Sequence, residues 1–255
     1  MSTQVFLHTI RCAYANRGLI VYGRLEVLVI SANIGAKQFV KKLRIIRPYT
    51  LGEEIGNAVS HGIMALIALG GIAPTAIHVY LRQGVLATVG ASVFMCSLFL
   101  MFLSSTLYHS MTGGTRQKQI MQILDHILIY VAIAGTYTPI ALSVIGGWPG
   151  IAITGLQWAM VVFGIFYKSL AKHTIPRVSL TIYLVMGWSA VIVAPLFVRN
   201  ASLGMLLLII GGGVFYSLGA YFYAKKEKLY FHMIWHFFVS LGAVSHYIGI
   251  LLFLR

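Results

Sequence analysis

The sequence predicts an all-α integral membrane protein, a bundle of seven transmembrane helices. Of its 255 residues, 59% are hydrophobic and only 9% are charged, whereas about 25% of the residues in ordinary soluble domains are charged. From residue 50 onward, apolar segments of about membrane-spanning length alternate with short polar connections. This pattern excludes a soluble globular enzyme and makes lipid the solvent of the fold.

The first 49 residues differ from the rest of the chain. The stretch 19–32 is fairly apolar, but it carries Arg24 and Glu26 and is shorter than the ~20 residues of a spanning helix. It also lacks the uninterrupted apolar core and cleavage site of a signal peptide. We therefore treat residues 1–49 as a basic tail outside a membrane domain of residues 50–255. A surface-lying extension, a disordered leader and an over-long gene start all remain open for this tail.

The membrane domain divides into seven apolar segments. The connections between them are short and carry glycine, proline or charged residues, which places neighbouring helices antiparallel in a compact bundle. Pro139 lies inside the third segment and is expected to kink that helix. The segments cover approximately residues 57–80, 85–108, 121–145, 151–166, 180–197, 203–223 and 233–254.

Lysine and arginine are distributed unevenly between alternate connections. Thirteen of them lie near one face of the predicted bundle, and only Arg82, Arg199 and Arg255 lie near the other. By the positive-inside rule the richer face is cytoplasmic, so the N-terminus is predicted inside the cell and the C-terminus outside. The same alternation excludes nucleic acid as a partner in spite of the formal net charge of +14, because the charge does not form one patch.

Two histidines open the seventh segment. His232 and His236 are four residues apart, so both imidazoles lie on one helical face and can reach one metal ion. Such a pair is also common at a membrane interface. However, the parity of the segments brings His109, at the end of the second segment, and Asp125, at the start of the third, to the same membrane face. This combination favours a metal site over an interfacial pair.

Further polar residues gather near that face. Asp125 is the only acid inside an apolar segment, and a charge in mid-bilayer costs on the order of 3 kcal/mol, which makes it a functional candidate. Ser105 lies one helical turn deeper than His109. Each has an ordinary alternative, because Asp125 could pair with Lys118 and Ser105 could bond to its own helix backbone.

Four polar residues start the first segment. Glu53, Asn57 and His61 follow one another at intervals of four along one side of the helix, and Glu54 adjoins them. We take Glu54, Asn57 and His61 as candidate supporting residues of the site, the alternative being a helix start with an interfacial face. The remaining histidines of the membrane domain are expected to lie outside the site: His78, His126, His173 and His246.

Together these motifs resemble those of the hemolysin III proteins, the bacterial branch of the progestin and adipoQ receptor family, which is related to the alkaline ceramidases. The resemblance covers about residues 50–255 and rests on the stretch from Glu53 to His61, Ser105-x-x-x-His109, Asp125-His126 with Gly135-Thr136-Tyr137-Thr138-Pro139, and His232-x-x-x-His236 with His246. It implies a seven-helix protein of the cell membrane with a zinc ion near the cytoplasmic face. It also implies His109, His232 and His236 as the zinc ligands, with Asp125 holding the water at the zinc and Ser105 beside it.

Three histidines leave the fourth tetrahedral position of zinc open for water, as in catalytic sites. Zinc lowers the pKa of that water toward ~7, and Asp125 is placed to take its proton. Water at this depth meets membrane lipid, and the resemblance to the alkaline ceramidases implies an amide bond, so a zinc-dependent hydrolase of a lipid amide is favoured. Two other classes remain: a pore-forming cytolysin, which the family name implies, and a non-enzymatic receptor or regulator of membrane lipid state with structural zinc.

Overall fold

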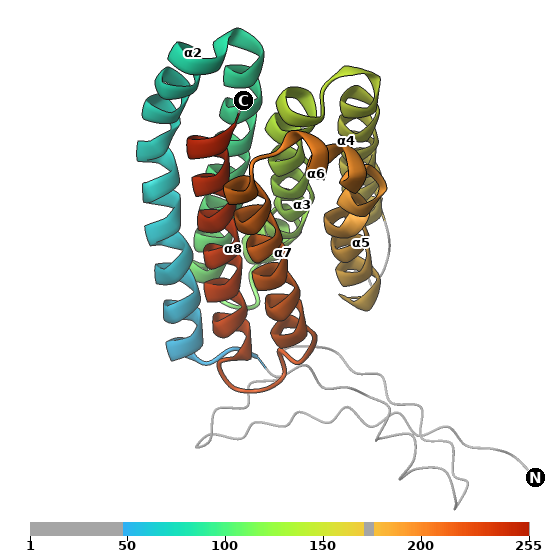
Figure 1. The fold of residues 1–255 in the computed structure, drawn as a ribbon. Helices are drawn as coiled ribbons and strands as arrows, with labels where there is room; N and C mark the ends of the chain where they lie inside the picture. Colours follow the sequence, from blue (N-terminus) through green and yellow to red (C-terminus); the bar gives the residue numbers. More distant parts are fainter. Residues whose placement is uncertain (1–47, 171–175, 255) are drawn as a thin grey trace, which may run out of the picture. The chain divides into compact units, whose positions relative to one another are not determined.

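The computed structural model describes residues 48–170 and 176–254, and within these ranges every regular element is helical. In the numbering of Figure 1 the elements are α2 (Leu51–Ser110), α3 (Arg116–Pro139), η1 (Ile140–Ile145), α4 (Gly147–Leu170), α5 (Pro176–Trp188), η2 (Ser189–Val193), α6 (Ala194–Asn200), α7 (Leu203–Ala224) and α8 (Phe231–Phe253). The described residues form six helical spans that are long and apolar enough to cross a membrane. The predicted all-α membrane fold is confirmed, but the described residues form six such spans where the sequence predicts seven segments. Apart from Pro48 and Tyr49, the predicted tail lies outside the described residues.

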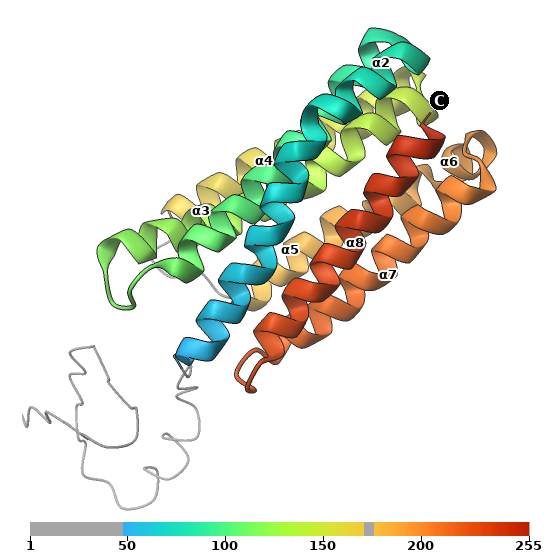
Figure 2. The ribbon, with the colours of Figure 1, turned by 90° about the vertical axis from the view of Figure 1, so that its left-hand side faces the viewer.

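The difference in number comes from α2, which is a single element of 60 residues where the sequence predicts two segments. Gly84 interrupts it with a φ of 77° and a ψ of −167°, which are not helical and which glycine adopts without strain from a Cβ. Figures 1 and 2 show the chain reversing its direction near this break. We call residues 51–83 the first arm of α2 and residues 85–110 the second arm. The arms touch through His61 and Phe102, whose ring centroids are 5.0 Å apart.

Local sequence signals explain where the helices begin. Thr50 caps α2: its Oγ1 accepts the N–H of Glu53 at 3.3 Å, and the Glu53 carboxylate accepts the N–H of Thr50 at 2.9 Å. This is the reciprocal arrangement that the Thr-x-x-Glu pattern favours. Helix α3 begins at Arg116, before the predicted start at residue 121. Asp125 therefore lies more than two turns into α3 and not at its start.

Two spans are irregular. At Pro139 the α-helical pattern of α3 ends, and the chain continues as the short π-helix η1. Proline lacks the N–H for the regular helical bond, so a disturbance at this position is the predicted effect of Pro139. The span Val178–Asn200 is likewise built from α5, the 3-10 turn η2 and α6.

The packing of α8 positions the candidate site. Helix α8 packs against α7 and α2, α2 packs against α3, and α3 packs against α4 and α5. Phe94, Phe102, Ala243 and Ile250 are buried in the central cluster. The outer helix faces keep many exposed leucine, isoleucine and valine side chains, as expected where helices that are apolar all round contact lipid. The first turns of α8 thus lie beside α2, which brings distant histidines together.

Gly90 allows the second arm of α2 to approach Pro139 closely. A Cβ on Gly90 would lie 2.8 Å from the Cα and 3.2 Å from the backbone N of Pro139. Because backbone atoms cannot rotate aside, Gly90→Ala is expected to destabilise the bundle by about 1–3 kcal/mol, measured as a lower unfolding temperature in detergent. Gly70→Ala is the control, because no heavy atom lies within 4 Å of its added Cβ. Equal unfolding temperatures for the two variants would contradict the close approach.

Candidate metal centre

Three buried histidines from distant parts of the membrane domain meet at one end of α8. His109 lies in the last turn of α2, and His232 and His236 lie in the first two turns of α8. Their exposed fractions are 3%, 5% and 0%. One ring nitrogen from each lies within 4.8 Å of those of the other two. The three predicted ligands are therefore close enough together to bind one metal ion, and we call them the triad.

The ring nitrogens of the triad fit a metal ion. The Nε2 atoms of His232 and His236 are 3.3 Å apart, close to the ~3.3 Å that separates two nitrogen ligands of tetrahedral zinc with bonds of about 2.0–2.1 Å. The Nε2 of His109 is buried and has no hydrogen-bond partner. A buried nitrogen left unpaired is costly, and a bound cation would satisfy it.

Glu54 orients the first ligand. Its Oε2 lies 2.6 Å from Nδ1 of His109, and its Oε1 lies 2.6 Å from Nζ of Lys118. Lys118 also donates to the carbonyl oxygen of Met111 at 2.9 Å. With Nδ1–H donated to the carboxylate, the lone pair of His109 is left on Nε2, the arrangement that fixes the tautomer of metal-binding histidines. Lys118, the alternative partner considered for Asp125, pairs with Glu54 instead.

The adjacent acid, Glu53, holds the start of α8. It is 1% exposed, and its Oε1 accepts the N–H of Tyr230 at 2.8 Å. Tyr230 is the N-cap of α8, has a φ of 61° and precedes His232 by two residues. Sequence reasoning placed Glu53 on one helical face with Asn57 and His61 but predicted no contact with α8. Its link to α8 spans 177 residues, and no local pattern predicts such a contact.

Asn57 and His61 adjoin the triad as predicted for supporting residues. Nδ2 of Asn57 lies 3.4 Å from Nδ1 of His109. The ring of His61 stacks on that of His236, with centroids 3.6 Å apart and planes inclined by 13°. Oδ1 of Asn57 and both ring nitrogens of His61 are buried without a partner. These two residues beside the triad therefore have atoms that are free to hydrogen-bond to a bound molecule.

Asp125 and Ser105 lie outside the ligand group, which comprises only the triad within the described ranges. Asp125 is 5% exposed and is close enough to the Ser105 hydroxyl, and to the charges of Lys168 and Lys226, to interact with them. Oγ of Ser105 is buried and has no hydrogen-bond partner among the described residues. The alternative that Ser105 bonds to its own helix backbone is therefore not observed.

Tyr49, the last residue of the predicted tail, packs on the triad. Its ring centroid is 4.9 Å from that of His232, with the planes inclined by 29°, and 5.8 Å from that of His109. Burial raises the pKa of the Tyr49 phenol well above its usual range, and neighbouring groups, among them Tyr108 and Asp125, raise it further. Tyr49 is therefore a neutral ring against the ligands. Sequence reasoning missed it, because a tyrosine just before a helix cap carries no signal of its own.

The other described histidines have separate environments. His246 Nε2 lies 3.0 Å from the carbonyl oxygen of Ile209, and His126 Nδ1 lies 2.6 Å from that of Gln122. His78 lies toward the far end of the first arm of α2. Within the described residues none of these three belongs to the group of converging histidines, and His173 lies outside the described residues.

Known proteins resemble this chain over most of its length. Residues 49–247 match the family described as Haemolysin-III related. The chain is 36% identical over 206 residues to the Hemolysin-3 homolog of Bacillus subtilis (strain 168), covering 80% of this chain and 96% of that protein. It is 34% identical over 202 residues to Hemolysin-3 of Bacillus cereus, covering 79% and 91%. It is 27% identical over 207 residues to the human monocyte to macrophage differentiation factor, covering 79% and 84%.

Proposed function

Because this chain belongs to the haemolysin-III-related family of multi-pass membrane proteins, we propose that it is a zinc-dependent hydrolase of a membrane lipid amide. The observation that carries the proposal is the triad, three buried imidazoles whose nitrogens converge within an apolar helix bundle. Donors of this kind suit zinc, and three of them leave one tetrahedral position open, as in catalytic sites. A lipid substrate is supported by the surroundings, because lipid is the molecule that an apolar bundle meets, and the amide bond rests on the resemblance to the alkaline ceramidases.

The proposal includes seven membrane crossings. A straight helix of 60 residues would be ~90 Å long, three times the ~30 Å of the hydrocarbon layer. The two arms of α2, divided at Gly84, are therefore assigned one crossing each. The thirteen lysines and arginines on one side, against three on the other, then place the N-terminus and the triad at the cytoplasmic face and the C-terminus outside.

Reporter fusions test this orientation. Alkaline phosphatase, which is active only outside the cytoplasm, is expected to be active when fused after Arg255 and inactive when fused after Gly113, in the connection between α2 and α3. Green fluorescent protein at the same two positions should give the opposite pattern. An inactive phosphatase together with a fluorescent fusion after Arg255 would contradict an odd number of crossings.

The side chains around the triad would divide the work of hydrolysis. Zinc held by His109, His232 and His236 would lower the pKa of a water molecule toward ~7 and polarise the amide carbonyl. Asp125 then accepts a proton from water as the general base and returns it to the departing amine nitrogen. Ser105, whose hydroxyl lies close enough to Asp125 to interact with it, would donate a hydrogen bond to the carboxylate and hold its orientation. The interaction of Asp125 with Ser105, both buried, supports these roles.

The decisive experiment measures metal and turnover on the same sample. Purified protein is expected to carry about one zinc per chain and to release fatty acid from an N-acylated sphingoid base. Asp125→Asn should keep the zinc and lose turnover by about 10²–10⁴-fold, the contribution of a general base. Zinc-loaded protein that cleaves no lipid amide would overturn the proposal.

Two other results would identify the alternative functions. The relatives named Hemolysin-3 favour a cytolysin as the second candidate, and escape of a trapped dye from liposomes that contain the purified protein, without lipid cleavage, would support it. A receptor or regulator with structural zinc would instead show a lower unfolding temperature on zinc removal and no turnover.

A further inference from the structure

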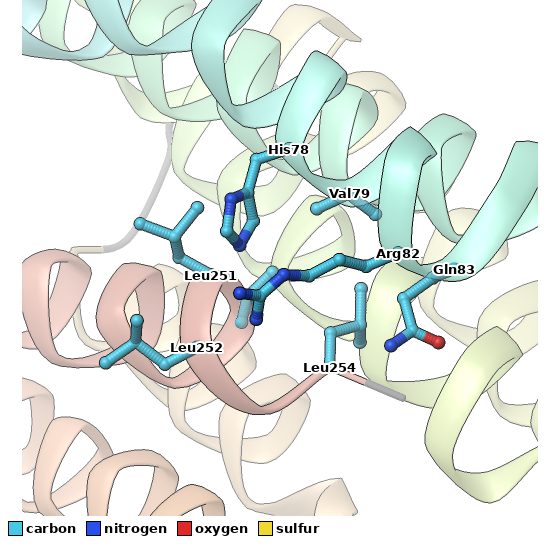
Figure 3. A pocket seen from close by; sticks show the side chains of 8 residues that line it. His78, Val79, Arg82, Gln83, Leu251, Leu252 and Leu254 are labelled. Atoms are coloured by element: carbon cyan, nitrogen blue, oxygen red, sulfur yellow. The ribbon is translucent and has the colours of Figure 1, made fainter.

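A cavity of about 210 Å³ lies between the end of the first arm of α2 and the end of α8 (Figure 3). Its walls include His78, Arg82 and Gln83 from α2 and Leu251, Leu252 and Leu254 from the last turn of α8 and just beyond. Leu251 follows His236 by 15 residues, a distance of ~22 Å along a helix. The cavity is therefore separate from the triad and shares no residue with it.

The polar side chains of the cavity offer donors that no described residue accepts: His78 is half-buried, and Arg82 and Gln83 are exposed. His78 and Arg82 are four residues apart and so share one face of the helix, and both extend toward the same space in Figure 3. The Nε2 of His78 is buried without a hydrogen-bond partner. Within residues 48–170 and 176–254, no ion pair or hydrogen bond engages the guanidinium of Arg82. Nothing within those ranges neutralises this charge by direct contact.

This set of donors selects an anion. The planar guanidinium of arginine presents a fork of N–H groups that matches a phosphate group, and an Nε2–H tautomer of His78 and the amide of Gln83 add further donors. No acidic residue is among the described residues that line the cavity. The end of the α8 dipole contributes only about half a negative charge, less than the full charge of Arg82. The cavity thus keeps a net attraction for an anion.

The rest of the lining indicates where the anion comes from. The leucines from the end of α8 form an apolar wall beside the donors. The cavity lies at the ends of two apolar helices, where its donors would face a lipid head group and its leucine wall would face the acyl chains. Basic pockets between transmembrane helices bind lipid head groups at the cytoplasmic face, and the same chemistry applies to this cavity at the opposite face.

We propose that this cavity binds a phosphate group, with Arg82 as its anchor and His78 and Gln83 as further donors. The phosphate belongs either to the head group of a phospholipid, whose chains lie along the leucines, or to free inorganic phosphate. The site does not depend on the metal centre, since no residue is common to both.

Three probes separate the two sources. Delipidated full-length protein in detergent is titrated with phosphatidylglycerol, with diacylglycerol of the same acyl chains, and with inorganic phosphate. Lipid binding is measured by native mass spectrometry and phosphate binding by the rise in unfolding temperature. Phosphatidylglycerol is expected to bind, and diacylglycerol at least tenfold more weakly.

The matched variants are Arg82→Gln and Arg199→Gln. Arg82→Gln removes the charge-assisted hydrogen bonds and should weaken phosphatidylglycerol binding by about tenfold or more. Arg199 is an exposed basic residue at the end of α6 that does not line the cavity, so Arg199→Gln should bind like the wild type. Arg82→Lys keeps the charge but loses the planar fork of N–H groups, so its affinity for phosphatidylglycerol should lie between those of the wild type and Arg82→Gln. It replaces Arg82→Gln in the test if that variant does not fold.

Each outcome decides the proposal. Binding of phosphatidylglycerol that depends on Arg82, without an effect of inorganic phosphate, supports a phospholipid site. Dependence on Arg82 for both probes supports a site for the phosphate group itself. Equal binding by wild type and Arg82→Gln, or an equal loss in Arg199→Gln, would overturn the proposal, the latter because it would reveal a general effect of surface charge.

Discussion

His236→Ala is expected to abolish stoichiometric zinc binding and, with it, lipid hydrolysis. His236 is fully buried, and its Nε2 is 3.3 Å from that of His232, so its removal leaves two imidazoles from different helices. Loss of a ligand should exceed the 10–100-fold fall in affinity that loss of an outer partner of a ligand causes. We therefore expect zinc affinity to fall by more than about 100-fold, measured by metal content after dialysis against a weak chelator.

His246→Ala is the matched control for this variant. His246 is also a buried histidine of α8, but it lies ten residues further along and near the carbonyl oxygen of Ile209, at 3.0 Å. Its replacement should lower the unfolding temperature while the zinc content stays at the wild-type level. If both variants lost zinc to the same extent, the loss would reflect unfolding of α8. If purified wild-type protein contained no bound metal, the proposal that the triad binds a metal ion would be contradicted.

Glu54→Gln is expected to weaken zinc binding by about 10–100-fold, because the carboxylate that fixes the tautomer of His109 is lost. The amide keeps the size of the side chain but cannot pair with both Nδ1–H of His109 and Lys118, which lie 2.6 Å from the two carboxylate oxygens. The measurement is a competition titration of zinc against a chelator of known affinity.

The neighbouring Glu53→Gln provides the contrast. Glu53 accepts the backbone N–H of Thr50 at Oε2 and that of Tyr230 at Oε1, and the single oxygen of a glutamine can still accept one of them. This variant is therefore expected to lose less zinc affinity than Glu54→Gln and to show its effect mainly as a lower unfolding temperature. Equal losses of affinity would contradict the distinct roles of the two adjacent acids.

The members of the triad could be predicted because they obey simple periodicities. The spacing of His232 and His236 fixes a common helical face, and the alternation of apolar segments places His109 near the same end of the bundle. Both rules depend only on helix geometry and on the requirement that spanning segments alternate in direction. In the structure, one ring nitrogen of each of the three histidines lies within 4.8 Å of those of the other two.

The connection predicted between residues 80 and 85 is present as non-helical backbone at Gly84, but the helix resumes immediately after it, so that α2 counts as one element. Other features depended on contacts that no local pattern encodes. Glu53 reaches Tyr230 across 177 residues, and Tyr49 packs on His232 only because the start of α2 lies beside the start of α8. Asp125 was predicted at the start of α3, and it lies deeper because the polar residues from Arg116 onward are already helical.

The distribution of the triad along the chain has a consequence for biogenesis. His109 leaves the ribosome more than a hundred residues before His232, and α8 is the last of the described helices to be synthesised. A nascent chain released before α8 carries one of the three imidazoles. It also lacks the N–H of Tyr230 that Glu53 accepts in the complete chain. At the proposed metal site, loading would therefore be a late event that follows insertion of the final helix, and bound metal would distinguish complete chains from truncated ones.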